Sequence, residues 1–242
     1  MQSRDPIHVL RRKAKLLSRH RFLPLHAALD AIAAEEGYRT WSLLVSRCGQ
    51  QQKPAVQLLQ ALKPGDLALI AARPKQGKTL MGLEMLMAAA SAGRSCAFFT
   101  LEYTTRDVID RLQALGADFE RLNDALRVDC SDTIDAEHIM ETLSCSSAGT
   151  VAVVDYLQLL DQKRDREPLA TQVTALRSFA RSRGLALVFL SQIDRSYDAS
   201  VKPLPDAQDI RLPNPLDLGL FDWMCFLQNG DMSISRTGTD RR

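Results

Sequence analysis

The strongest constraint on the fold is the stretch from Leu67 to Thr79, where an apolar run passes into a short polar loop. Residues 67–72 are all aliphatic, residues 73–79 read Arg-Pro-Lys-Gln-Gly-Lys-Thr, and residues 80–90 are rich in the strong helix formers Leu, Met and Ala. A strand, a tight turn and a helix in this order surround a phosphate with backbone N–H groups and the positive end of the helix. The stretch therefore predicts a P-loop that binds a nucleotide.

The residue types of the loop give each position a role. In a P-loop the lysine, here Lys78, reaches the β- and γ-phosphates, and the hydroxyl of Thr79 ligates Mg²⁺. The sequence departs from G-x-x-x-x-G-K-[ST] at one position, where Ala72 replaces the first glycine. Alanine rarely adopts a positive φ, so we expect the turn to begin with ordinary backbone angles. The predicted nucleotide-binding residues of the loop are Ala72, Arg73, Pro74, Lys75, Gln76, Gly77, Lys78, Thr79 and Leu80. The alternative is a polar turn before an amphipathic helix.

Length and composition favour one globular domain with a small extension. The chain has 242 residues, of which 45% are hydrophobic and 25% charged, enough for one sizeable core. No apolar run approaches the roughly 18 residues of a membrane span, the first residues do not resemble a signal peptide, and the five cysteines lack C-x-x-C spacing. We therefore expect a cytoplasmic protein that does not contact a membrane.

Residues 1–54 are predicted to form a basic helical extension that ends in a linker. Helical periodicity covers residues 7–19 and 24–47, and polar residues with helix breakers follow at 48–54. The first 24 residues hold seven Lys or Arg but a single acid, Asp5. This basic end could meet phosphate or an acidic partner, or it could be a solvated helix face.

Residues 55–242 alternate short apolar runs with helical patterns, which predicts an α/β domain with a mainly parallel sheet flanked by helices. In such sheets ligands lie beyond the carboxyl ends of the strands, so polar residues at those ends are the best candidates for chemistry. The candidate strands are residues 67–72, 95–101, 126–129, 150–155 and 186–191.

Three polar residues stand at these strand ends. Glu102 could polarise an attacking water, or it could be an acid that favours a helix N-terminus. Asp155 ends an apolar strand in the Walker B form and could hold Mg²⁺ or its water. Gln192 could hydrogen-bond the γ-phosphate or the water, or it could belong to a turn.

Four motifs together resemble the ATPase domain of DnaB-type replicative DNA helicases, in order and in spacing. They are Ala71–Thr79, Thr100–Tyr103, Val154–Leu159 and Leu190–Arg195. That family's P-loop also begins with Ala, and the resemblance covers roughly residues 60–230. It implies a RecA-like fold, ATP with Mg²⁺, a homo-oligomer that could be a hexameric ring, and translocation on single-stranded DNA.

The resemblance also implies residue roles. Lys78, Glu102 and Gln192 would be catalytic, and Thr79 and Asp155 would hold the metal. The family's DNA-facing loops correspond to residues 161–168 and 195–203, where phosphate contacts would be salt-dependent and largely blind to sequence. The candidate contacts are Lys163, Arg164, Arg166, Arg195 and Lys202. Solvated loops are the alternative.

Three departures separate the chain from that family. Residues 209–222 contain Pro213 and Pro215, so they cannot form the family's uninterrupted helix. The family ends on a strand whose Lys-x-Arg pair reaches the γ-phosphate of a neighbouring subunit, and Arg236 is the well-placed candidate in this sequence. The N-terminal domain of full replicative helicases is replaced by basic helices, which could dock a neighbouring subunit or a replication partner.

Three functions therefore remain open, because a fold does not settle a function. The first is an ATP-driven DNA translocase or helicase whose hydrolysis DNA stimulates. The second is a regulatory ATPase of the KaiC or RadA kind, which hydrolyses slowly and is indifferent to DNA. The third is a nucleotide-binding adaptor that docks on a replisome through its N-terminal helices and hydrolyses almost nothing.

Overall fold

The computed structural model describes residues 7–44, 53–161, 167–212 and 214–237. They belong to two compact units, Met1–Lys53 and Pro54–Arg242. None of the described helices is both long and apolar enough to cross a membrane.

The smaller unit is built on a helical pair, α1 (Ile7–Arg21) and α2 (Leu25–Glu35), followed by a helical turn at residues 41–44. Gly37, with φ of +85°, follows the end of α2. The backbone N–H of Trp41 donates to Asp30 Oδ1 at 2.8 Å, which holds the last turn against α2. The buried core of this unit is Leu10, Ala14, Ala28, Ile32, Ala33 and Leu44.

The larger unit contains a seven-stranded sheet in the order β3-β2-β4-β5-β1-β6-β7. The first six strands in this order run parallel and β7 is antiparallel to β6. The strands are β1 (Leu67–Ala72), β2 (Cys96–Thr100), β3 (Leu126–Asp129), β4 (Val151–Asp155), β5 (Ala186–Gln192), β6 (Trp223–Gln228) and β7 (Asp231–Arg236).

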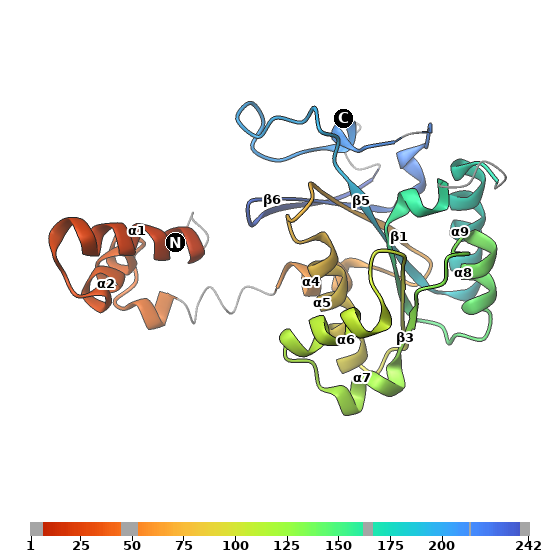
Figure 1. The fold of residues 1–242 in the computed structure, drawn as a ribbon, viewed down its shortest axis with the longest axis horizontal. Helices are drawn as coiled ribbons and strands as arrows, with labels where there is room; N and C mark the ends of the chain where they lie inside the picture. Colours follow the sequence, from red (N-terminus) through yellow and green to blue (C-terminus); the bar gives the residue numbers. More distant parts are fainter. Residues whose placement is uncertain (1–6, 45–52, 162–166, 213, 238–242) are drawn as a thin grey trace. The chain divides into compact units, whose positions relative to one another are not determined.

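Helices cover both faces of this sheet (Figure 1). Every residue of β1 is buried, and alternate residues serve opposite faces because side chains of a strand alternate. Leu67, Leu69 and Ala71 join the core under α8 (Ala136–Thr142) and α9 (Leu169–Arg183). The other three residues of β1 join the core under the remaining helices. These are α4 (Pro54–Ala61), α5 (Lys78–Ser91), α6 (Thr105–Ala114) and α7 (Phe119–Ala125).

All five predicted strands are present, and the fold is the predicted α/β sheet. The β6–β7 hairpin was not among the predictions. Its sequence signal is Asn229-Gly230, the pair most typical of a tight hairpin turn because both residues tolerate a positive φ, and both have one here, 53° and 87°. Between Ile210 and Asp222 the described residues contain no α-helix, only the short 3₁₀ turn η3 (Leu218–Leu220), as the prolines predicted.

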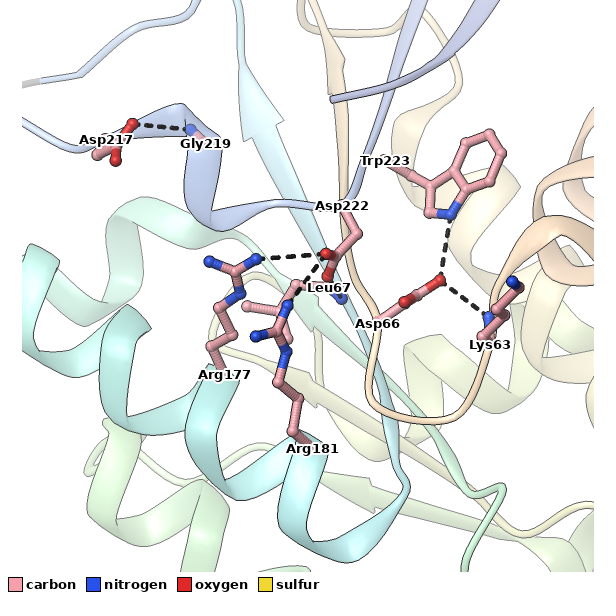
Figure 2. Close-up of polar contacts among 9 residues, drawn as sticks. All are labelled: Lys63, Asp66, Leu67, Arg177, Arg181, Asp217, Gly219, Asp222 and Trp223. Carbon is pink, nitrogen blue, oxygen red and sulfur yellow. Dashed lines mark hydrogen bonds and ion pairs between the residues drawn. The ribbon is translucent and has the colours of Figure 1, made fainter. Parts of the chain in front are cut away.

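A polar cluster ties the amino ends of β1 and β6 to α9 (Figure 2). Asp222 Oδ1 accepts from Arg177 Nη2 at 3.3 Å and from Arg181 Nη2 at 3.4 Å, while its Oδ2 accepts from the backbone N–H of Leu67 at 2.9 Å. Next to it, Asp66 Oδ2 accepts from Trp223 Nε1 at 3.2 Å. The cluster satisfies the first N–H of β1 and closes the edge of the sheet opposite the P-loop.

Candidate functional site

The P-loop connects the end of β1 to the first turn of α5. Within it, positive φ occurs at Lys75 (66°) and Gly77 (92°), so Ala72 enters the turn with ordinary backbone angles as predicted. Gly77 is the N-cap of α5, and no side chain caps the helix there. A Cβ at Gly77 would meet no atom within 4 Å, so glycine is favoured there by φ rather than by space. The first N–H groups of α5 are therefore available for an anion.

The centre of the site is Asp155, fully buried at the carboxyl end of β4. Its Oδ1 lies 3.0 Å from Lys78 Nζ, and its Oδ2 accepts from Thr79 Oγ1 at 2.8 Å. Lys78 and Thr79 are themselves buried on the first turn of α5. The structure thus brings the predicted Walker A and Walker B side chains into direct contact across 76 residues of sequence.

Glu102 lies beside this pair, two residues after β2. Its Oε2 is 3.9 Å from Lys78 Nζ, and its side chain is 34% exposed. Burial raises the pKa of Glu102 above its usual value, the charge of Asp155 raises it further, and the charges of Lys78 and Arg111 partly offset that rise. A carboxylate that protonates closer to neutral pH is a better general base than an ordinary one.

Lys78, Thr79 and Glu102 line a cavity of about 470 Å³ at the carboxyl edge of the sheet, whereas the fully buried Asp155 does not. Gln192 lines it from the end of β5, where it pairs in register with Ala72. Of the predicted nucleotide-binding residues, those that line the cavity are Pro74, Lys75, Gly77, Lys78, Thr79 and Leu80. Such a volume suits a small-molecule ligand, and the strand ends converge as a parallel sheet requires.

Two residues that the sequence analysis did not identify also line the cavity. Tyr103 follows Glu102, and Arg111 lies on α6 with its Cζ 4.3 Å from the centre of the Tyr103 ring. The signal for Arg111 was available: Thr104 and Asp107 form a capping box, which predicts a helix starting directly after Glu102. A helical wheel then places Arg111 beside the buried face of that helix.

Two residues of the predicted P-loop have side chains that bond to other loops and do not line the cavity. Arg73 Nη1 donates to the carbonyl of Tyr197, in the loop after β5, at 3.5 Å. Gln76 Oε1 accepts from the backbone N–H of Asn229, at the tip of the β6–β7 hairpin, at 2.7 Å. Neither side chain lines the cavity, so any contact of Gln76 with a phosphate would have to come from its backbone.

Arg236 lies far from this chain's own site. It pairs in register with Trp223, and Trp223 pairs with Ala68 near the start of β1, so Arg236 is at the amino edge of the sheet. Its guanidinium carbon lies 6.0 Å from the centre of the Trp223 ring. Arg236 therefore cannot act in the cavity of its own subunit, and a role toward a neighbouring subunit stays a prediction.

The structure describes only some of the residues predicted to contact nucleic acid. Lys163, Arg164 and Arg166 lie outside the described residues, and Arg195 is exposed. Lys202 forms ion pairs within its own loop, with Asp206 and, at 2.7 Å, with Asp209, and these bonds raise its pKa. Its ammonium group is thus already held by two carboxylates, and its contact with a phosphate stays a prediction.

The donor set fits Mg²⁺ bound together with a nucleotide. Mg²⁺ prefers hard oxygen ligands and usually takes one or two from the protein, the rest coming from phosphates and water. The hydroxyl of Thr79, which lines the cavity, and the buried carboxylate of Asp155, which accepts from that hydroxyl, supply such oxygens. Among the described residues no cluster of three or more His, Cys, Asp or Glu could hold a metal without a ligand's help.

Comparison with known proteins agrees with this geometry. Residues 57–203 match the family described as "ATPase: KaiC". The chain is 26% identical over 186 residues to the replicative DNA helicase DnaB of Leifsonia xyli subsp. xyli, which covers 64% of this chain and 41% of the relative. It is 25% identical over 181 residues to a probable plasmid replicative DNA helicase of Chlamydia trachomatis, covering 62% and 40%.

The chain thus spans less than half the length of these curated relatives. Among solved structures, a DnaB-like replicative helicase, described together with its interactions with primase, superposes with a TM-score of 0.57 at 15% identity, covering 94% of this chain and 73% of that one. A KaiC-like protein of the archaeon Pyrococcus horikoshii superposes with a TM-score of 0.54 at 14% identity, covering 74% and 82%. At these identities the likeness concerns the fold, which is RecA-like.

Proposed function

The chain belongs to the KaiC family of ATPases, and we propose that it binds Mg·ATP in the cavity around Lys78 and hydrolyses it as a DnaB-like translocase on single-stranded DNA. The observation that carries the proposal is the contact of buried Asp155 with both Lys78 and Thr79. A buried carboxylate that bonds a P-loop lysine and hydroxyl at a cavity is the arrangement that phosphoryl transfer needs. The similarity to DnaB proteins supports DNA as the partner and a homo-oligomer as the working form.

Hydrolysis would proceed by in-line attack of water on the γ-phosphate, with positioning and charge supplying the catalysis. Backbone N–H groups of the P-loop and of the first turn of α5 would hold the phosphates, and Lys78 Nζ would neutralise their charge. Thr79 and Asp155 would hold Mg²⁺, which would supply further neutralisation. Glu102 would take the proton of the attacking water, and its raised pKa suits that role.

Gln192 is the residue best placed to report the state of the γ-phosphate. Its side chain faces the cavity, while its backbone carbonyl accepts from the N–H of Arg211 at 2.8 Å. The next residue, Ile193, forms an isolated bridge with Ile210. Movement of Gln192 would therefore be passed to the segment after β5, which is where the resemblance locates a DNA-facing loop.

One observation favours the second candidate, a regulatory ATPase whose slow hydrolysis does not depend on DNA. The tip of the β6–β7 hairpin, residues 228–231, stands next to the P-loop and contains neither Lys nor Arg. Arg236 lies at the other edge of the sheet. An arginine supplied by a neighbouring subunit contributes a rate factor of about 10³ to 10⁵, so a subunit interface without one would leave hydrolysis slow.

A paired measurement separates the candidates. The steady-state ATPase rate is measured with and without a poly-dT oligonucleotide, and the mass of the assembly is measured by light scattering with and without ATP. The translocase proposal expects DNA to raise the rate and ATP to promote assembly, both lost in Lys78→Ala. A slow rate that DNA leaves unchanged would replace it with the regulatory ATPase, and failure to bind ATP would reject both.

A further inference from the structure

The positive charge of this protein is concentrated in its smaller unit. Residues 1–53 hold ten Lys or Arg and four Asp or Glu, a formal charge of +6. Because the whole chain carries +2, residues 54–242 carry −4. A polyanion would therefore be attracted to the smaller unit and weakly repelled by the larger one, although the larger one contains the loops that the resemblance assigns to DNA.

Three of the cations of the smaller unit share one helix face. α1 contains six Lys or Arg and no acid. Its apolar side is fixed against α2 by Leu10 and Ala14, which are fully buried. At 100° per residue, Arg12, Lys15 and Arg19 fall on the side opposite to these two, and all three are exposed. The packing of α1 thus holds a stripe of cations outward over about two helical turns.

An exposed aromatic ring follows the stripe. Phe22, in the turn between α1 and α2, is 94% exposed and has φ of 50°, which is uncommon for a bulky residue. Two hydrogen bonds fix the turn: Ser18 Oγ donates to the carbonyl of Leu23 at 2.7 Å, and the N–H of Leu23 donates to the carbonyl of Ser18 at 3.2 Å. The turn therefore holds an apolar ring in water, which costs free energy unless a ligand covers it.

We propose that α1 and the turn at Phe22 form a binding surface for single-stranded nucleic acid. Arg12, Lys15 and Arg19 would contact the phosphates, and a base would stack on Phe22. Cations along a groove or ridge combined with an exposed aromatic ring are how single strands are bound without regard to sequence. An acidic protein segment would satisfy the cations, but stacking gives the exposed ring a partner that every nucleotide carries. The surface belongs to the smaller unit and the ATP site to the larger one, so binding is expected to need no hydrolysis.

Fluorescence anisotropy of a labelled dT20 oligonucleotide with the full chain, without ATP and over a range of KCl concentrations, tests the proposal. Replacing Arg12, Lys15 and Arg19 with Gln keeps helix-forming residues and leaves the buried face intact. Each lost phosphate contact lowers the slope of log affinity against log salt by about 0.7 for single strands, so the triple variant should lose about 2 from the slope. The matched control is Lys63→Gln, Arg106→Gln and Arg127→Gln, three exposed cations of the larger unit that remove the same net charge.

Phe22→Ala provides the second arm. It should weaken dT20 binding about tenfold, the loss expected for one stacked base, without changing the salt slope. An abasic 20-mer should bind the unchanged chain and Phe22→Ala equally. An unchanged slope in the triple Gln variant, or an equal loss in its control, would overturn the proposal. So would displacement of dT20 by poly-glutamate at equal charge concentration, since the surface would then recognise charge alone. The ATPase rate without DNA should be the same in all of these variants, so a failure here is distinct from a failure of the ATPase assignment.

Discussion

Each edge of the sheet holds an aspartate between two basic or polar partners, but only the aspartate of the carboxyl edge is fully buried. At the carboxyl edge Asp155 contacts Lys78 and Thr79, and at the amino edge Asp222 contacts Arg177 and Arg181. The distances differ little. What differs is the surroundings of each aspartate and its partners.

The partners of Asp155 belong to a glycine loop and a helix N-terminus that open onto a cavity. The third partner of Asp222 is the first N–H of β1, so its carboxylate completes the hydrogen bonding of the sheet (Figure 2). A ligand that brings phosphate and metal can take over the contacts of Asp155, whereas nothing can replace those of Asp222 without opening the sheet. An aspartate paired with cations therefore does not by itself indicate a functional site; a cavity and a helix N-terminus beside it favour one.

Of the variants at the two edges, Lys78→Ala should have the largest effect on the ATPase rate. It removes the cation that meets the phosphates, so the ATPase rate should fall by more than about 10³-fold. Lys63→Ala, an exposed lysine of the same unit that does not line the cavity, is the matched control and should keep most of the rate. Steady-state kinetics of both variants, with circular dichroism to establish folding, give the answer. A Lys78 variant that turns over normally would remove the carboxyl edge from the mechanism.

Glu102→Gln should separate binding from hydrolysis at the same edge. The amide keeps the shape of the side chain but cannot accept the proton of water, so hydrolysis should fall about 10²- to 10⁴-fold. Calorimetric titration with Mg·ATP should still show binding. Glu137→Gln, an exposed acid on α8, serves as the control. Unchanged hydrolysis in Glu102→Gln would leave Glu102 with a structural role only.

Asp222→Asn should lower the stability of the protein and leave its ATPase rate unchanged. The amide loses the charge that both arginines contact, so the free energy of unfolding should fall by about 1–3 kcal/mol, while the ATPase rate per folded molecule stays the same. Urea unfolding and kinetics on one preparation measure both quantities. Asp231→Asn, an exposed acid at the start of β7, should change neither. Loss of rate without loss of stability would mean that the amino edge is coupled to the cavity.

Sequence alone was sufficient where the signal is local. The P-loop and the five strands follow from short patterns, and the convergence of Lys78, Glu102, Asp155 and Gln192 follows from the parallel arrangement of strands. The carboxyl ends of parallel strands meet at one edge of the sheet. The strands predicted from the sequence therefore already bring these residues together. The role of each residue in catalysis stays a prediction that the variants above test.

The remaining features depend on geometry that no local pattern contains. Arg236 was expected to reach the γ-phosphate of a neighbouring subunit; because β7 runs antiparallel to β6, it lies at the amino edge of its own sheet, and the role toward a neighbour stays a prediction. The DNA contact of Lys202 stays a prediction, but the sequence did not indicate that the path of its loop brings Asp206 and Asp209 against it. The partners of Asp222 lie 41 to 155 residues away in sequence. Pairings over such separations appear only once the chain is folded.

Arg111→Ala should give the smallest effect on the ATPase rate. It tests whether Arg111 acts through Glu102 at the carboxyl edge. Arg111 helps to hold down the pKa of Glu102, which burial raises, so its removal should raise that pKa further. Glu102 must be deprotonated to act as a base, and the rate is lost as pH falls through its pKa; the acidic limb of the pH–rate profile should therefore move to higher pH. At neutral pH the loss of rate should stay below the roughly 10²-fold that removal of a general base causes. Arg106→Ala, on the same helix with a side chain 85% exposed, should leave the limb in place. A limb that moves equally in both variants, or in neither, would show that Arg111 does not act through Glu102.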